Sequence, residues 1–316
     1  MKSLKNTFTL LVVTLFLITS CENNEDVGPV ISNPFTPPSA EAFETIQDDA
    51  FNDLKQIATF NAEDGINFVS DAGVSLSITG TCLSLDGNPV TGEIDLEFVE
   101  VFDRGNMLTT NATTVGENQS GERAQLISGG EFHIKAYQNG EELTLDCGMM
   151  LNVPTAITGG EVPGMGPFEG EIDNDGNLVW LPQNTEFWIS EQDSVQQVSQ
   201  NYNAFVENFG WFNCDVFVSD PDPKTEIQLA VPQGFDNTNS SVYMARVGEP
   251  NSLAYIYGEF PIGLEAHIIF LSEQGGEFLY AIKSITVEDG QQVSFTVDEI
   301  NSASTENLTQ IINNLP

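Results

Sequence analysis

The chain has 316 residues, of which 47 are acidic and only 9 basic, and its formal net charge at pH 7 is −38. Such a chain is a poor partner for nucleic acid, and charge does not draw it to anionic lipid, because both interactions need clusters of Lys and Arg. Hydrophobic residues make up 40% of the sequence, which is enough for packed cores and excludes a wholly disordered chain.

The first residues have the layout of a secretory signal peptide. Two lysines precede an apolar run from Phe8 to Ile18, and small residues lead from it to Cys21. The run is shorter than the roughly 20 residues that span a bilayer. Leu17-Ile18-Thr19-Ser20-Cys21 resembles the lipobox of bacterial lipoproteins. The resemblance implies a signal peptide over residues 1–20 and lipidation of Cys21; the alternative is an ordinary cleaved signal with an incidental cysteine.

Residues 21–38 are predicted to form a flexible, acidic and Pro-rich tether behind this cysteine. Such a composition favours extended and poorly packed chain. Only Lys2 and Lys5 lie before the cleavage point, so the mature chain keeps 7 of the 9 basic residues against 47 acidic ones, a charge near −40. The simplest interpretation of the excess of acidic residues is that they keep the protein soluble. A more specific interpretation is that some of them bind a divalent cation.

An amphipathic helix is predicted over residues 39–59, with Ser39 as its N-cap. Its apolar side chains recur every three or four residues, which places them on one face. They are Phe43, Ile46, Ala50, Leu54 and Ile57.

Residues 60–155 are predicted to form a first β-sandwich domain. Short stretches alternate apolar and polar side chains, as half-buried strands do. At Val99 the alternation slips by one residue, which predicts a β-bulge. Asn139-Gly140 predicts a type I′ hairpin turn, because both residues tolerate positive φ. Residues 104–125 are read as a long polar loop.

With Cys21 assigned to lipid, Cys82, Cys147 and Cys214 remain, and a secreted protein can form a disulfide. Three single pairings are open. We favour Cys82 with Cys147, because both fall in the first domain. The alternative, that all three are buried free thiols, stays open.

Residues 156–203 are read as a connecting segment with strands, and residues 204–316 as a second β domain that ends in a helix. The expected fold is therefore mainly β, with two antiparallel β-sandwich-like domains after the signal peptide and tether, a short N-terminal helix and a C-terminal helix.

Asp173 and Asp175 are the weak candidates for a metal site. With Asn174, Gly176 and Asn177 they resemble the start of a calcium loop, so Ca²⁺ is the one cofactor considered. The residue expected to supply the last bidentate ligand is Asn184 instead of Glu. The strand-like residues on both sides favour a plain hairpin turn.

The sequence contains no recognisable catalytic motif. His133 and His267 both lie in strand patterns, and no nucleophile elbow, zinc motif or phosphate-binding loop accompanies them. The tryptophans Trp180, Trp188 and Trp211 stand in apolar stretches, which favours core packing over platforms for sugar rings.

Four stretches carry a family resemblance: Gly80–Gly92, Asp103–Leu108, Ser128–Phe132 and Gly210–Asp215. The first three resemble a β-sandwich module, reminiscent of the ZU5 domain, of uncharacterised Gram-negative envelope lipoproteins. The last resembles a Gly-Trp-Ile-Asn-Cys-Asp signature of the same proteins, with Phe212 in place of Ile. The resemblance implies an outer-membrane, lipid-anchored location and transfers no catalytic residue.

We therefore expect a lipid-anchored envelope protein, surface-exposed or not, with a non-catalytic binding or structural role. Its expected partners are the membrane, through the lipid, and other envelope proteins or glycans, with no nucleic acid. One alternative is a glycan-binding lipoprotein of a polysaccharide-uptake system. Another is a secreted hydrolase that uses carboxylates.

Overall fold

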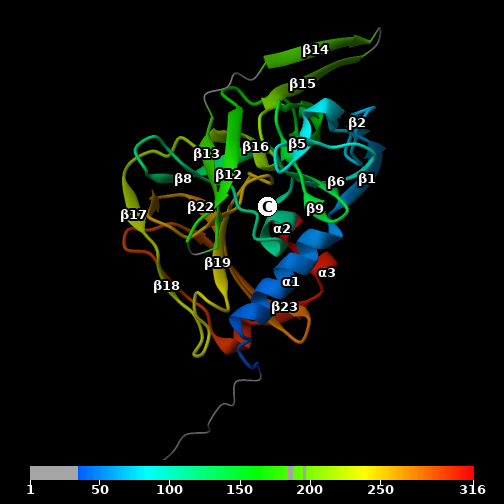
Figure 1. Ribbon diagram of the computed structural model, residues 1–316. Coiled ribbons are helices and arrows are strands. Elements are labelled where there is room, and N and C mark those ends of the chain that lie inside the picture. Colours follow the sequence, from blue (N-terminus) through cyan, green and yellow to red (C-terminus); the bar gives the residue numbers. More distant parts are fainter. Residues whose placement is uncertain (1–34, 175, 184–187, 195–196) are drawn as a thin grey trace, which may run out of the picture. The chain divides into compact units, whose positions relative to one another are not determined.

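The computed structural model describes residues 35–174, 176–183, 188–194 and 197–316, and for residues 188–194 and 197–199 it describes the backbone alone. Strands dominate this part and helices are few, one of them at the C-terminal end (Figure 1). The expectation of a mainly β protein is confirmed at this level. Two sandwiches do not account for the strands, because the described strands lie in six sheets. Cys21 and most of the predicted tether lie outside the described residues.

The largest sheet, called sheet A here, joins distant parts of the chain. Its strands in order are β1 (Gln56–Asn61), β6 (Glu93–Val101), β8 (Arg123–Gln138), β16 (Gly210–Phe217), β12 (Gly166–Ile172), β13 (Leu178–Pro182) and β7 (Val115–Glu117), and β9 (Glu141–Glu142) pairs with β8 alone. Strand β8 is 16 residues long and also pairs with β7. Strands β8, β16, β12, β13 and β7 therefore close into a small barrel around Trp180.

A second sheet, sheet B, packs on the inner face of sheet A and completes a β-sandwich. Its strands in order are β14 (Trp188–Ser194), β15 (Gln197–Val206), β11 (Met149–Pro154), β3 (Ser75–Ile78) and β2 (Ile66–Val69). Leu76 and Leu151 of sheet B share one buried cluster with Phe98, Phe132 and Phe212 of sheet A. A small separate sheet consists of β10 (Thr144–Leu145), β4 (Leu83–Leu85) and β5 (Asn88–Pro89), in that order. Along the chain, these strands fall between strands of the sandwich.

The sequence placed Gly210–Phe217 in the second β domain, and the structure corrects this. Strand β16 lies inside sheet A, between β8 and β12. Strand β15 likewise pairs with β11 of the sandwich. The second group of strands therefore begins after Phe217 and not at Ala204, because alternation shows which face of a strand is buried but not which strand it pairs with.

The second group is built on a five-stranded sheet, sheet C. Its strands in order are β20 (Ala254–Tyr255), β19 (Ser241–Arg246), β22 (Glu265–Gln274), β23 (Glu277–Thr286) and β25 (Asn301–Ala303). The pairs β17 (Lys224–Glu226) with β21 (Glu259–Pro261) and β18 (Gln228–Ala230) with β24 (Gln292–Ser294) stand beside it. Both faces of sheet C are buried, which explains the continuous apolar run of β22.

Three α-helices of the described chain cover one face of sheet C: α1 (Ala40–Asp53), α2 (Arg104–Thr109) and α3 (Thr305–Asn313). Ser39 caps α1 and Ser304 caps α3, each by accepting a hydrogen bond from a backbone N–H of the first turn. Short 3-10 turns lie at η1 (Gly80–Cys82), η2 (Thr155–Thr158) and η3 (Val297–Glu299).

Two expectations about these segments are wrong. The first helix ends at Asp53, and Ile57 lies instead in β1 with 67% of its surface exposed. The polar stretch 104–125 is not a loop throughout, since it holds α2 and β7. Asp103 caps α2 by accepting from the Asn106 N–H at 2.9 Å.

Sheet A is covered on its outer face as well. Val99 and Val101 of β6 point away from the sandwich and pack with residues of α1, α2 and sheet C. The pairing of β6 with β8 is regular through Val99 to Val101, so the predicted bulge is absent there. The apparent slip in alternation arises because both faces of this end of β6 are buried. The outer face of sheet A, under α1, is where the candidate site lies.

Candidate functional site

A hollow of about 250 Å³ lies between helix α1 and the outer face of sheet A, and it is called the α1 pocket here. This volume is near the lower end of the roughly 300–1,000 Å³ common for small-molecule sites, so it suits a small ligand. The lining residues are Glu44, Gln47, Asp48, Phe51, Thr110, Asn111, Ala112, His133, Ile172, Gly176, Leu178 and Trp211.

Three aromatic side chains from three elements meet in the wall of the α1 pocket. Trp211 of β16 pairs directly with His133 of β8, which places the two rings side by side on one face, 4.9 Å between centroids. Phe51, in the last turn of α1, lies 5.4 Å from each of them. Trp180 supports Trp211 from the barrel side with an edge contact at 5.9 Å.

The imidazole of His133 is uncharged at neutral pH. Burial under α1 lowers its pKa to about 4, and the charges of Lys135 and Lys55 act in the same direction. The ring faces helix α1, where it meets Phe51 edge-on. A neutral, half-buried imidazole beside an indole and a phenyl ring forms an apolar wall.

A chain of hydrogen bonds fixes the polar part of the lining. Gln47 donates its amide N–H to the Tyr243 hydroxyl at 3.4 Å, and that hydroxyl donates to the Asn111 side-chain oxygen at 2.8 Å. Thr110 donates its hydroxyl to the Asn106 carbonyl at 2.7 Å. These donors therefore point into the protein and not into the pocket.

Two fully buried carboxyl groups lie in the strands behind this wall. Glu131 is two residues from His133 in β8 and shares its face. Burial, and then the charge of Asp215, raise the pKa of Glu131 well above its usual value, and burial does the same for the pKa of Asp215. Neither oxygen of Glu131 has a hydrogen-bond partner among the described residues. Both groups are therefore held toward their protonated form.

Asn213 and Ser128 connect this pair to the two strands. Asn213 donates to the Asp215 carboxyl at 2.6 Å, and Ser128 donates its hydroxyl to the Asn213 oxygen at 2.9 Å. These residues belong to two of the stretches that carry the family resemblance, which β8 and β16 place side by side. No sequence pattern indicated this cluster, because polar residues inside strand patterns are expected to face solvent.

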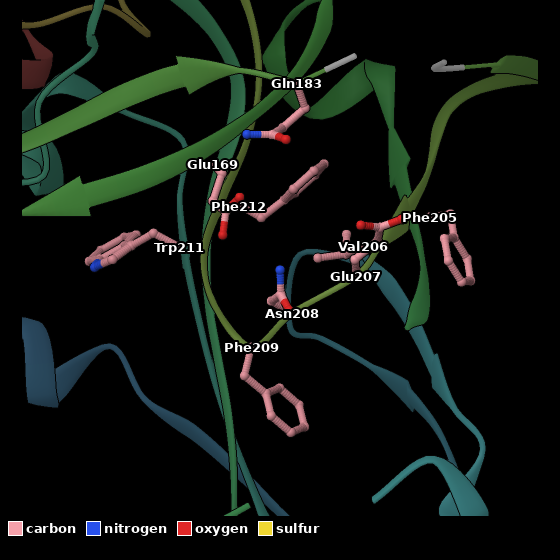
Figure 2. A pocket seen from close by; sticks show the side chains of 9 residues that line it. All are labelled: Glu169, Gln183, Phe205, Val206, Glu207, Asn208, Phe209, Trp211 and Phe212. Carbon is pink, nitrogen blue, oxygen red and sulfur yellow. The ribbon is translucent and has the colours of Figure 1, made fainter. Parts of the chain in front are cut away.

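A second hollow lies on the other side of Trp211. Figure 2 shows its nine lining residues, with the Trp211 ring and the Phe205 ring on opposite sides of the view. Its volume is about 40 Å³, enough for a water molecule but not for an organic ligand. The α1 pocket is therefore the better candidate site.

The cysteines divide into a bonded pair and a buried thiol. Cys82 is joined to Cys147 by a disulfide, with 5.1 Å between the Cα atoms, which is the pair favoured from the sequence. Cys214 is a free thiol, and burial raises its pKa well above the usual value. A thiol in that state is a poor nucleophile. The proposed lipidation residue, Cys21, lies outside the described residues.

The interactions of the Asp173 carboxylate do not suit calcium binding. It forms an ion pair with Arg123 at 2.7 Å and accepts a hydrogen bond from the Asn177 backbone N–H. Ile172 pairs with Leu178, so the residues between them connect two antiparallel strands. Asp175 lies outside the described residues. Within the described part of the chain, no group of three or more His, Cys, Asp or Glu side chains is arranged to hold a metal.

The tryptophans have different environments. Trp180 is fully buried in the barrel and donates its N–H to the Thr113 carbonyl at 2.8 Å, whereas Trp211 lines the α1 pocket. The side chain of Trp188 lies outside the described residues. A sequence signal for the pocket did exist: Phe51 is an apolar residue off the main apolar stripe of α1, next to Glu44 and Asp48 on the helix surface.

No protein-family model, no curated protein and no solved structure matches this chain. The resemblance to envelope lipoproteins therefore stays an expectation from the residues quoted for it. No helix in the described part of the chain is long and apolar enough to cross a membrane.

Proposed function

We propose that this protein is a lipid-anchored protein of the cell envelope that binds a small ligand in the α1 pocket and catalyses no reaction. The observation that carries the proposal is the wall of Phe51, His133 and Trp211 beside the carboxylates of Glu44 and Asp48. Apolar rings with a few polar groups are the usual composition of a binding site. No Ser or Cys is among the described residues that line the pocket.

The binding role of the pocket is tested by ligand-observed NMR on the full chain in detergent, with a panel of sugars and small metabolites. Phe51→Leu should weaken the signal of any ligand, because it removes a ring from the wall. Phe43→Leu is the matched control, since Phe43 lies on the same helix and in the apolar cluster that Phe51 also packs against, but does not line the pocket. Equal loss in both variants would point to a stability effect, and no signal from any probe would refute the binding role.

The anchor is proposed from Cys21 and the residues before it. Each buried CH₂ of an acyl chain contributes about 0.8 kcal/mol, so several chains on one cysteine hold a strongly acidic protein on a membrane. Cys21→Ala should abolish labelling by radioactive palmitate and release the protein from the membrane fraction, with an unchanged circular dichroism spectrum. A variant that still sediments with the outer membrane as fully as wild type would contradict the anchor and favour attachment through another envelope protein.

A glycan is the second candidate ligand. Trp211 supplies a ring near Glu44, Asp48 and Gln47, and stacking beside hydrogen-bond acceptors is how proteins hold sugar rings. Binding of envelope polysaccharide fragments that Phe51→Leu weakens would support this ligand. Turnover of the same fragments, abolished by a single carboxylate substitution, would favour the hydrolase alternative instead.

A further inference from the structure

The ionised side chains that line the α1 pocket all carry the same sign. Glu44 and Asp48 lie one turn apart on α1, and both are exposed. Neither takes part in an ion pair of the described chain. No Lys or Arg belongs to the described lining residues. The potential at the mouth of the pocket is therefore negative.

The nearest bases do not cancel this charge. Lys55 and Lys135 are close enough to lower the pKa of His133. However, Lys55 is paired with Glu97 at 3.0 Å and Lys135 with Glu142 at 2.8 Å. Each base is neutralised by its own carboxylate, so Glu44 and Asp48 remain the uncompensated charges at the pocket.

The uncharged part of the lining also favours a cation over an anion. The Thr110 hydroxyl and one Gln47 amide N–H donate to other groups of the protein, so neither is offered to an anionic ligand. The faces of Phe51 and Trp211 carry the negative end of the ring quadrupole, which attracts cations. His133 adds no opposing charge, because its pKa of about 4 keeps it neutral at physiological pH.

We propose that the α1 pocket binds a small organic ammonium ion, with its alkylated nitrogen against the aromatic wall and its charge toward Glu44 and Asp48. This inference rests on the proposed binding function and names its ligand class. An alkylated ammonium suits the site because its methyl groups are apolar while its charge is spread over them. The small volume of the pocket restricts the ligand to a compact head group with a short tail.

The test compares choline with its uncharged carbon analogue, in which a tert-butyl group replaces the trimethylammonium group. The two molecules have the same shape, so a difference in affinity measures the charge. Titration of each into the full chain, followed by NMR or calorimetry, should show choline binding at least about 10-fold more tightly. High salt should reduce the preference, because the two carboxylates are exposed.

Charge variants on α1 sharpen the test. Glu44→Gln and Asp48→Asn should each weaken choline binding by about 2- to 5-fold, as expected for exposed charges, and should leave the carbon analogue unaffected. Asp53→Asn is the matched control, because Asp53 is an exposed acid of the same helix that is not among the lining residues of the pocket. Its affinity for choline should equal that of wild type.

Each outcome decides between the proposals. Equal affinities for choline and the carbon analogue would overturn the cation assignment. If a neutral ligand then bound and Phe51→Leu weakened it, the binding function would stand without this inference. If choline, the carbon analogue and the sugar panel all failed to bind, both proposals would be refuted.

Discussion

Strands β8 and β16 have two buried faces that differ in chemistry. The inner face contributes Phe132, Ile134 and Phe212 to the sandwich core, where the Phe132 ring meets the rings of Phe98 and Phe102. The outer face carries Glu131 and His133, with Asn213 and Trp211 across from them, and the rings of His133 and Trp211 contact Phe51 of α1. Both faces of these strands are therefore covered, but the inner face is apolar and fully buried, whereas the outer face combines buried polar groups with the half-buried rings of His133 and Trp211.

This difference indicates that the inner face contributes to stability alone. Burying an apolar side chain favours folding, whereas burying a titratable group without a partner opposes it. On the outer face, burial raises the pKa values of Glu131 and Asp215 and lowers the pKa of His133. We expect changes to the inner face to alter stability at all pH values, and changes to the outer face to alter its pH dependence and ligand binding.

The largest expected effect is that of Phe132→Ala on the inner face. Phe132 is fully buried and contacts Phe98 and Phe102 at 5.9 and 5.8 Å between ring centroids. Its removal should lower the free energy of unfolding by about 3–5 kcal/mol, because it leaves a cavity that the core fills only in part. Denaturant unfolding measures this, and Phe132→Leu should cost much less. A loss below about 1 kcal/mol would show that the two faces do not differ as described.

The disulfide at the edge of the sandwich should have an effect of similar size. Cys82 and Cys147 close a loop with a sequence separation of 65, so replacing both by Ser should cost about 4 kcal/mol on the chain-entropy model. Cys214→Ala is the control, since it removes a buried thiol and leaves the disulfide intact. If the control lost more stability than the double variant, the loop-closure argument would fail.

Next comes His133→Phe, which should change the response to acid. The pKa of His133 is about 4 in the folded protein against 6.5 for an unperturbed histidine, so the unfolded chain takes up its proton first as the pH falls. Wild type should therefore lose about 2–3 kcal/mol between pH 6.5 and pH 4 through this group. His133→Phe should lack that loss, whereas Phe132→Leu should retain it. Parallel pH profiles for wild type and His133→Phe would contradict the lowered pKa.

Glu131→Gln should also change the pH dependence of stability, with the opposite sign. The pKa of Glu131 is higher in the folded protein than in the unfolded chain, so its stabilising contribution is present at low pH and is lost as the pH rises above the unfolded value. One such group changes stability by at most about 1.4 kcal/mol per pH unit. The Gln variant should flatten this slope above about pH 4.5, the ordinary range of a Glu, while Glu93→Gln at an exposed position should not. An unchanged slope in the Gln variant would mean that Glu131 is not the source.

Local rules predicted several features correctly. Ser39 caps the first helix as expected. Asn139 and Gly140 have φ values of 53° and 84°, as a type I′ turn between β8 and β9 requires. Alternation identified the inner face of β8, because every second residue of a strand points to the same side.

What the sequence by itself determined is thus the mainly β class, the start of the first helix, the tight turn and the apolar faces, all of which depend on residues within a few positions of one another. Only the tertiary structure decided that Val99 is buried on a second face, that Ile57 belongs to a strand, and that β16 lies inside sheet A. The α1 pocket needs Phe51, His133 and Trp211 together, from positions separated by up to 160 residues. Periodicity records one buried face of an element, while the partner that covers its other face depends on the path of the whole chain.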